Sequence, residues 1–287
     1  MEENRSKKIW SKILYYGLLI IFSLIFIGSA IYIGKYVWGS LEAAGEYGSL
    51  QDQYVPPSRP PITEATQGTG DTQDSVPPVT ETVPSTEVTE PAGPVILPEL
   101  QIFYEQNQHV VGWISVPNTK INYPVLQSPE RPDYYLNHTF QGKWSPWGAI
   151  YVRETCDVFK PSDNITLYGH HMKDGSMFSG LDNYRQKEFW EENPYIYFDT
   201  LYERHTYQVI ATFKTSANYG EGFSYHLYED FASEEEFNYY LSSIKELSKY
   251  YYENDVSAQF GDKFITLSTC EYTLDNGRLV VVAKRVA

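Results

Sequence analysis

Two side chains near the end of the chain, Cys270 and Arg278, could together form and stabilise an anion. Cys270 follows a short apolar, β-branched run over 264–267, and Arg278 directly precedes a second run over 279–283. The seven residues between the two include an Asn-Gly turn dipeptide, and so short a connection favours antiparallel strands. The thiol and the guanidinium would then be neighbours, and a nearby cation favours the thiolate, which is the reactive nucleophile.

His170 and His171 are the candidates for the base that a nucleophilic cysteine needs. They follow an apolar run over 164–168 and stand in a glycine-containing loop, the kind of segment that often carries functional residues. Even with Cys270 they are too few to complete a structural metal site, and we expect neither a metal nor a cofactor. The remaining histidines occur singly and are interpreted as surface or structural residues: His109, His138, His205 and His226.

Other interpretations of Cys270 stay open on the residues alone. Most free cysteines are small buried hydrophobes. In an oxidising compartment Cys270 could also form a disulfide with Cys156, the second of the two cysteines. Two cysteines in 287 residues are too few for a disulfide scaffold.

Short apolar runs separated by Pro, Asn and Gly fill the chain from residue 98 onward. This recurrence predicts a mainly β domain over 98–287, an antiparallel barrel or sandwich with peripheral helices. A short helix is expected to begin at Pro98. A long helix is expected after the capping box formed by Ser233 and Glu236, ending near 252–254. The other predicted strands cover 110–116, 121–126, 148–152, 164–168, 195–198 and 207–213.

The N-terminal segment has the composition of a membrane anchor. Residues 13–34 carry no charge and are long enough to cross a bilayer core of about 30 Å. Because basic side chains precede them, we expect 1–12 to be a cytoplasmic tail and 13–38 a single transmembrane signal-anchor, with the rest of the chain extracellular. A signal peptide cleaved near 28–30 is the alternative.

Residues 39–97 are expected to be an acidic extracellular linker. Ten prolines and eight threonines fall within 46–98, and so few apolar side chains cannot offset the entropy of the chain. We expect a disordered, extended stalk that holds the catalytic domain off the membrane; a docked, ordered arm is the alternative. The net charge of −15 argues against nucleic acid as a partner, because phosphate binding needs a basic face.

Several motifs, in order, resemble those of class B sortases, the membrane-anchored cysteine transpeptidases of Gram-positive bacteria. The resemblance spans about 98–287 and includes a long helix shortly before the last motif. The motifs are the segments 118–125 and 135–138, Tyr-Gly-His-His-Met over 168–172 with Gly-Ser-Met-Phe over 175–178, and Thr-Leu-Ser-Thr-Cys over 266–270 with Arg278.

The resemblance implies an eight-stranded sortase barrel and a catalytic set of Cys270, His170 and Arg278. His170 takes the role rather than His171 because the histidine of the family directly follows a glycine. Cys270 would attack a carbonyl of a C-terminal sorting signal of the Asn-Pro-x-Thr or Leu-Pro-x-Thr type. The ordinary pKa values of Cys and His leave mostly thiol and neutral imidazole at neutral pH, so we expect slow turnover.

The partners follow from this chemistry. Ser268 and Thr269 flank the nucleophile and are candidates for binding the signal peptide, and the Tyr-rich loop 215–231 is expected to line that pocket. The acyl group would pass to an amine of the peptidoglycan or, alternatively, to a pilin lysine.

Two other classes of protein remain as competing interpretations. A papain-like hydrolase usually carries its cysteine before its histidine, whereas Cys270 follows His170 by 100 residues. A non-enzymatic stalked adhesin fits the linker and the charge equally well, and only the Cys, His and Arg set argues against it.

Overall fold

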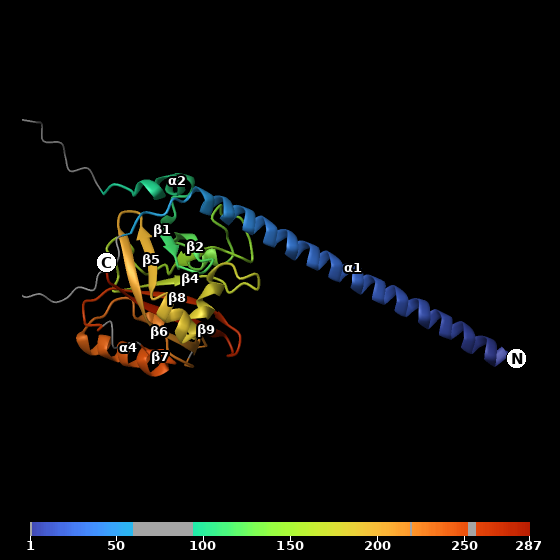
Figure 1. Ribbon diagram of the computed structural model, residues 1–287. Coiled ribbons are helices and arrows are strands. Elements are labelled where there is room, and N and C mark those ends of the chain that lie inside the picture. Colours follow the sequence, from blue (N-terminus) through green and yellow to red (C-terminus); the bar gives the residue numbers. More distant parts are fainter. Residues whose placement is uncertain (1, 60–93, 219, 252–256) are drawn as a thin grey trace, which may run out of the picture.

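A computed structural model of the chain describes residues 2–59, 94–218, 220–251 and 257–287 (Figure 1). The central part of the predicted stalk, 60–93, and the predicted end of the long helix, 252–254, lie outside the described residues. The helices are α1 (Glu2–Gln53), α2 (Pro98–Gln106), α3 (Lys187–Glu192) and α4 (Glu234–Leu247), with the 3₁₀ helices η1 (Tyr134–Leu136), η2 (Phe178–Arg185) and η3 (Tyr225–Leu227). The strands are β1 (Val110–Ser115), β2 (Asn122–Leu126), β3 (Ile150–Val152), β4 (Asn164–Tyr168), β5 (Tyr195–Thr200), β6 (Arg204–Ser216), β7 (Tyr250–Tyr251), β8 (Phe264–Glu271) and β9 (Gly277–Arg285).

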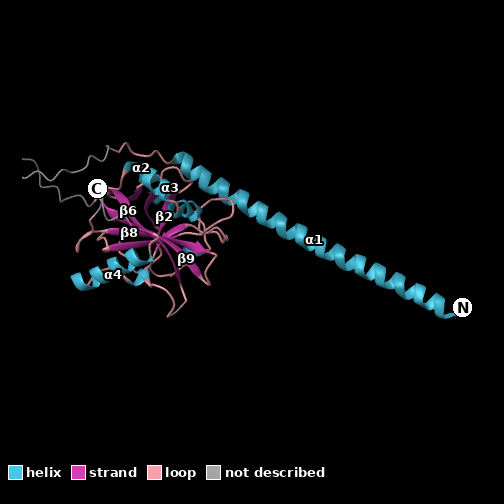
Figure 2. Cartoon of the chain, turned by 60° about the horizontal axis from the view of Figure 1, so that its bottom comes forward, coloured by secondary structure: helices cyan, strands magenta, loops and turns pink. Residues whose placement is uncertain are grey.

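Eight of these strands close into a barrel with helices around it (Figure 2). Their order is β5-β1-β2-β3-β4-β8-β9-β6, and β5 pairs again with β6 to complete the ring. The two-residue β7 pairs with β6 outside the ring. An eight-stranded barrel has an interior that side chains can fill, as buried Ile114, Leu267 and Val281 do here. The predicted mainly β class is confirmed.

Two strand pairs of the barrel are parallel, β2 with β3 and β4 with β8. The expectation of a purely antiparallel barrel is therefore wrong at these pairs. A parallel pair needs a long crossover, and the chain between β4 and β8 supplies one that contains α3, α4, β5 and β6. Because parallel strands end at the same edge, the residues that follow β4 lie beside the end of β8.

Helix α4 packs on the outer face of β6, β8 and β9. Ser233 caps it by accepting a hydrogen bond from the backbone N–H of Glu236 at 3.2 Å, and the Glu236 carboxylate accepts one from the N–H of Ala232 at 2.8 Å. The predicted start of the helix is thus confirmed. The apolar side of α4 and the outward residues of these strands form one buried cluster that includes Phe237, Tyr240, Ile244, Phe264, Val280 and Val282.

The far end of α4 differs from the prediction. The helix ends at Leu247 rather than near 252–254, because Ser248 has extended backbone angles and the chain then forms β7. The Ser248 hydroxyl also bonds the carbonyl of Ile244 at 2.6 Å, closing the last turn. Tyr251 continues the helical spacing of apolar residues but belongs to a strand.

Helix α1 extends from the barrel as a straight rod (Figure 1). Its segment Lys12–Gln53 is long and apolar enough to cross a membrane, by length and composition. The expectation that the linker begins at residue 39 is wrong for residues 39–53, which continue the helix. Residues 39–54, the docked segment, pack on the barrel through a face of buried apolar side chains: Ala43, Tyr47, Leu50 and Tyr54.

Candidate active site

A cleft of about 350 Å³ lies at the edge where β4 and β8 end. Its lining includes the predicted catalytic set and the two predicted substrate-binding residues: Cys270, His170, Arg278, Ser268 and Thr269. Cys270 is partly exposed and its thiol is free. The parallel register, with Tyr168 opposite Ser268, brings His170 and Cys270 to one edge.

The β8–β9 hairpin sets Cys270 beside Arg278. The strands are antiparallel, as predicted, and these two residues are direct partners across the ladder. The turn places Asn276 in the left-handed region at φ 46°, and the Arg278 guanidinium donates to the carbonyls of Asn276 and Gly277 at 3.1 and 3.0 Å. These bonds hold the guanidinium beside the turn, on the same face of the sheet as the thiol.

Glu271, the residue after Cys270, fixes the other side of this turn. Its buried carboxylate accepts a hydrogen bond from the Lys214 ammonium at 2.5 Å and others from the hydroxyl and the N–H of Thr273, both at 2.8 Å. Burial acts to raise the pKa of Glu271, but the bonds from Lys214 and Thr273 outweigh it and lower the pKa to about 2. The carboxylate is therefore ionised wherever the protein is folded near neutral pH.

His170 leaves β4 through Gly169, where only a glycine fits. A Cβ on Gly169 would lie 2.5 Å from the Ile150 side chain and 2.8 Å from the Phe178 ring. The Nε2 of His170 lies 2.7 Å from the carbonyl oxygen of Leu136. Because a carbonyl only accepts, this hydrogen bond requires the proton on Nε2 and leaves Nδ1 as the nitrogen that gains or loses a proton.

His171 has different partners. Its Nε2 lies 2.7 Å from a carboxylate oxygen of Asp182, and its backbone carbonyl accepts a hydrogen bond from the Tyr272 hydroxyl at 2.9 Å. These contacts hold the loop that carries both histidines. Of the two rings, that of His170 lines the cleft.

The loop between β6 and α4 contributes three residues to the cleft, as predicted for 215–231: Ala217, Tyr225 and His226. The buried Tyr225 hydroxyl shares a 2.6 Å hydrogen bond with the hydroxyl of Ser268. His226, interpreted from the sequence as a surface or structural histidine, also lines the cleft. Burial lowers the pKa of His226, and the charges of Arg153 and Arg278 lower it further, so His226 is neutral at neutral pH.

Ser268 and Thr269 are both buried, at 1% and 2% exposure. The hydroxyl of Ser268 already contacts Tyr225, so Ser268 shapes the cleft together with that ring. The Thr269 hydroxyl has no hydrogen-bond partner within the described part of the chain. Arg153, which the sequence analysis did not single out, also lines the cleft and binds the carbonyl of His226 at 2.8 Å.

A protein-family model described as the sortase domain matches residues 114–286 of this chain. The chain belongs to the sortase family. It is 32% identical to sortase B of Staphylococcus aureus over 191 residues, which are 66% of this chain and 75% of that protein. It is 33% identical to sortase B of Listeria monocytogenes over 192 residues, 66% of this chain and 74% of the relative. The sortase is thus a cysteine transpeptidase of class B.

Solved structures agree with this assignment. Sortase B of Bacillus anthracis in complex with AAEK1 superposes with a TM-score of 0.64 at 30% identity, covering 87% of this chain and 99% of that one. A sortase B–substrate complex from S. aureus gives a TM-score of 0.60 at 31% identity, covering 67% and 86%. The eight-stranded barrel of the sortase is therefore the fold of its class.

The second cysteine of the sortase lies away from the cleft. Cys156 is free and buried, which makes the alternative of a disulfide with Cys270 wrong. Its sulfur lies 3.8 Å from the carbonyl oxygen of Asn164, and burial raises its pKa to about 12. Cys156 is accordingly an inert core thiol.

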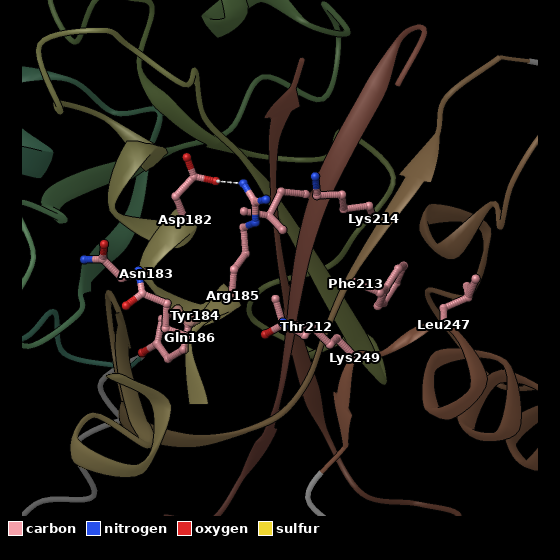
Figure 3. Close-up of a pocket in the computed structure, with 11 residues that line it drawn as sticks. Asp182, Asn183, Tyr184, Arg185, Gln186, Thr212, Phe213, Lys214, Leu247 and Lys249 are labelled. Atoms are coloured by element: carbon pink, nitrogen blue, oxygen red, sulfur yellow. Dashed lines mark ion pairs between the residues drawn. The ribbon is translucent and has the colours of Figure 1, made fainter. Parts of the chain in front are cut away.

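A larger cavity, about 630 Å³, lies between η2 and β6 of the sortase (Figure 3). Its lining, among the described residues, includes neither Cys270 nor His170. Two of its cations are already paired: Arg185 with Asp182 at 3.6 Å, and Lys214 with Glu271 at 2.5 Å. Asp182 contacts His171 in the loop that carries both histidines, and Glu271 directly follows Cys270. This cavity therefore adjoins the elements that hold the catalytic candidates.

Proposed function

We propose that the sortase cleaves a C-terminal sorting signal of a surface protein and transfers the acyl group to an amine of the cell wall, using Cys270, His170 and Arg278. The observation that carries this proposal is their convergence in one cleft, with Cys270 and Arg278 as direct partners in the β8–β9 ladder. A thiol beside a fixed cation and near an imidazole is the arrangement that nucleophilic cysteine catalysis needs.

In the first step the Cys270 thiolate attacks the carbonyl carbon of the scissile peptide bond. The Arg278 guanidinium, with backbone N–H groups near Glu271, stabilises the oxyanion of the tetrahedral intermediate. When the C–N bond breaks, protonated His170 gives the proton on Nδ1 to the leaving amine. Nε2 keeps its proton, which stays hydrogen-bonded to the Leu136 carbonyl, and a thioester on Cys270 remains.

In the second step an incoming amine attacks the thioester. Neutral His170 accepts a proton from that amine at Nδ1, a new amide forms, and the Cys270 thiolate leaves. The ring returns to its starting protonation state without breaking its contact with Leu136. Only enzyme with both a thiolate and an imidazolium begins the cycle. Because cysteine and histidine side chains in general are mostly thiol and neutral imidazole at neutral pH, slow turnover is expected.

The substrates are proposed from the family. One related structure is a sortase B–substrate complex from S. aureus, and another is sortase B complexed with triglycine. For this chain we propose an Asn-Pro-x-Thr or Leu-Pro-x-Thr signal, bound near Ser268, Thr269 and Tyr225, and a peptidoglycan amine as the acceptor. The apolar part of α1 anchors the chain in the membrane, with its basic N-terminus cytoplasmic and the barrel outside.

Mass spectrometry of the full chain in detergent tests this function. A peptide carrying either signal is expected to leave an acyl adduct on Cys270, and an added amine to resolve the adduct faster than water does. Cys270→Ala removes the adduct, and Cys156→Ala, as a matched control, keeps it. If glycine peptides resolve the adduct faster than a lysine side chain does, the acceptor preference supports wall anchoring. The reverse preference supports pilus assembly. No adduct from a chain whose Cys270 still reacts with small thiol reagents contradicts the proposal.

A further inference from the structure

We propose that the docked segment of α1, residues 39–54, positions His170 for catalysis through Tyr47 and Ser40. The two side chains contact the two loops that set the orientation of the imidazole: the segment 135–148 and the His loop, residues 169–177. The inference rests on the catalytic role proposed for His170.

The first connection is made by Tyr47. Its buried hydroxyl donates a 2.5 Å hydrogen bond to the carbonyl oxygen of Gly148. The Tyr47 ring also packs edge-on against Tyr123 of β2, with ring centres 5.5 Å apart. The ring is therefore fixed on the barrel, and its hydroxyl restrains the backbone at residue 148.

Gly148 in turn supports the carbonyl that binds His170. It has a φ of 56°, and it approaches the 135–136 backbone so closely that a Cβ would lie 2.3 Å from the Leu136 oxygen. The next residue, Ala149, donates its N–H to the Tyr135 carbonyl at 2.9 Å. The segment held by Tyr47 is therefore in contact with the Leu136 carbonyl, which accepts the Nε2–H of His170 at 2.7 Å.

The second connection is made by Ser40. Its hydroxyl donates to a carboxylate oxygen of Asp174, in the His loop, at 3.2 Å. The Trp147 indole N–H donates to the same oxygen, also at 3.2 Å, and the Tyr36 ring of α1 lies 5.4 Å from the indole. Asp174 thus joins α1, the segment 135–148 and the His loop at one carboxylate.

These contacts bear on the step in which His170 moves a proton. In the neutral ring the Leu136 carbonyl keeps Nε2 protonated and Nδ1 free, so moving that carbonyl out of hydrogen-bond reach removes the preference for this tautomer. A helix that braces both loops therefore acts on the tautomer and direction of the ring, although it supplies no atom to the cleft. Tyr47 and Ser40 are positioning residues.

Tyr47→Phe in the full-length protein in detergent micelles is the test, and Tyr54→Phe is its matched control. Tyr54 belongs to the same docked segment, but its hydroxyl contacts Asp199 at 3.4 Å, and its ring stays stacked on Trp113 without it. We expect Tyr47→Phe to slow thioacyl formation about three- to tenfold, the effect of losing one hydrogen bond, with KM little changed. Tyr54→Phe is expected to leave the rate unchanged.

The ring nitrogens of His170 give a readout that a loss of general stability does not move. Nitrogen-15 spectra of histidine-labelled protein, assigned with His170→Gln, are expected to show the Nε2–H tautomer in the parent chain and in Tyr54→Phe, and a mixed population in Tyr47→Phe. Ser40→Ala, which acts through the other loop, is expected to slow the same step while the melting temperature stays within about a degree.

Equal rates and equal tautomer populations in Tyr47→Phe and Tyr54→Phe would overturn the proposal, as would equal losses in both. The outcome is separable from the function proposed above. If His170→Gln retains full activity, the catalytic role of His170 is wrong, whereas the tautomer spectra still report whether α1 orients the ring.

Discussion

At the residue scale the chain carries two thiols in opposite surroundings. Cys270 is partly exposed and faces a fixed guanidinium, whereas Cys156 is buried against the carbonyl of Asn164. The pKa of about 12 gives Cys156 a thiolate fraction on the order of a thousandfold below that of an ordinary thiol. Since the thiolate is the reactive species, the same reagent should distinguish the two side chains.

We therefore predict that iodoacetamide labels Cys270 of the native protein while Cys156 stays protected. Peptide mapping after a timed exposure at about pH 7.5 measures both sites in one sample, with roughly a hundredfold difference in rate expected. Unfolding the protein in urea should make the two rates converge, because burial is the cause of the difference. Comparable labelling of both cysteines in the native state would contradict this assignment.

The sequence could predict one half of the site better than the other. The apposition of Cys270 and Arg278 follows from two apolar runs and a short turn, and the structure confirms it. The convergence of His170 with them depends on the parallel β4–β8 pair, which no local pattern indicates. Tyr225 and His226 were missed individually because they lie in an irregular loop, where spacing says nothing about which side chain faces the cleft.

At the element scale the junction between β4 and the His loop depends on close packing at Gly169. A methyl group there would meet Ile150 and Phe178 inside van der Waals contact. We predict that Gly169→Ala lowers stability by about 1–3 kcal/mol, the usual cost of overpacking, and slows acyl transfer at least about tenfold because His170 follows directly. Thermal unfolding and the adduct assay measure the two effects.

Gly48→Ala is the matched control for that substitution. Gly48 lies in α1, and apart from its chain neighbours and the local helix backbone no described heavy atom lies within 4 Å of the Cβ that alanine would add. We expect equal or slightly higher stability, because alanine favours a helix over glycine, and unchanged activity. A Gly169→Ala enzyme as active as Gly48→Ala would show that the junction tolerates movement.

The turn after β8 should make the stability of the protein depend on pH. Because the folded pKa of Glu271 is lowered to about 2 from an ordinary value of 4.5, its contribution is present above about pH 4.5 and is lost as the pH falls toward 2. We predict that Lys214→Met lowers the melting temperature most above about pH 5, and that the difference from the parent shrinks toward about pH 2. Lys187→Met, which alters an exposed pair with Glu191, should cause no such pH-dependent difference.

The helix ends show what local signals can and cannot supply. Ser233 and Glu236 mark the start of α4 because capping depends on neighbouring residues, and the start was predicted correctly. Its end was predicted too late because the apolar spacing continues to Tyr251, while pairing of β7 with β6 decides the conformation there. Tertiary contacts of this kind override a local pattern.

At the scale of the whole molecule the folded unit extends N-terminal to the predicted boundary at Pro98. The predicted linker 39–97, rich in Pro and Thr over 46–98, includes buried apolar side chains that pack on the barrel: Ala43, Tyr47 and Leu50 of α1, and Tyr54 just after it. Beyond α1, Arg59 reaches the barrel and contacts both carboxylate oxygens of Asp199, at 2.7 and 2.6 Å. Asp199 is 1% exposed, and Arg59 is the cation that contacts its carboxylate.

A fragment that starts at residue 98 should therefore be less stable than one that starts at residue 39. Without Arg59 the buried carboxylate of Asp199 is left without its cation, which costs about 3–5 kcal/mol and lowers the melting temperature by on the order of 10 °C. Loss of the docked segment also uncovers the Trp113 face on which Tyr54 stacks. Calorimetry of the two fragments at one pH and ionic strength measures the difference.

Asp199→Asn separates the charge from the lost packing. In the short fragment it removes an unpaired buried charge, so it should raise the melting temperature. In the long fragment the substitution breaks the contact with Arg59, so it should lower the melting temperature. Opposite signs in the two fragments would establish that residues before 98 complete the core of the catalytic domain. The same sign in both would mean that Arg59 does not neutralise Asp199, and that packing alone joins the docked segment to the barrel.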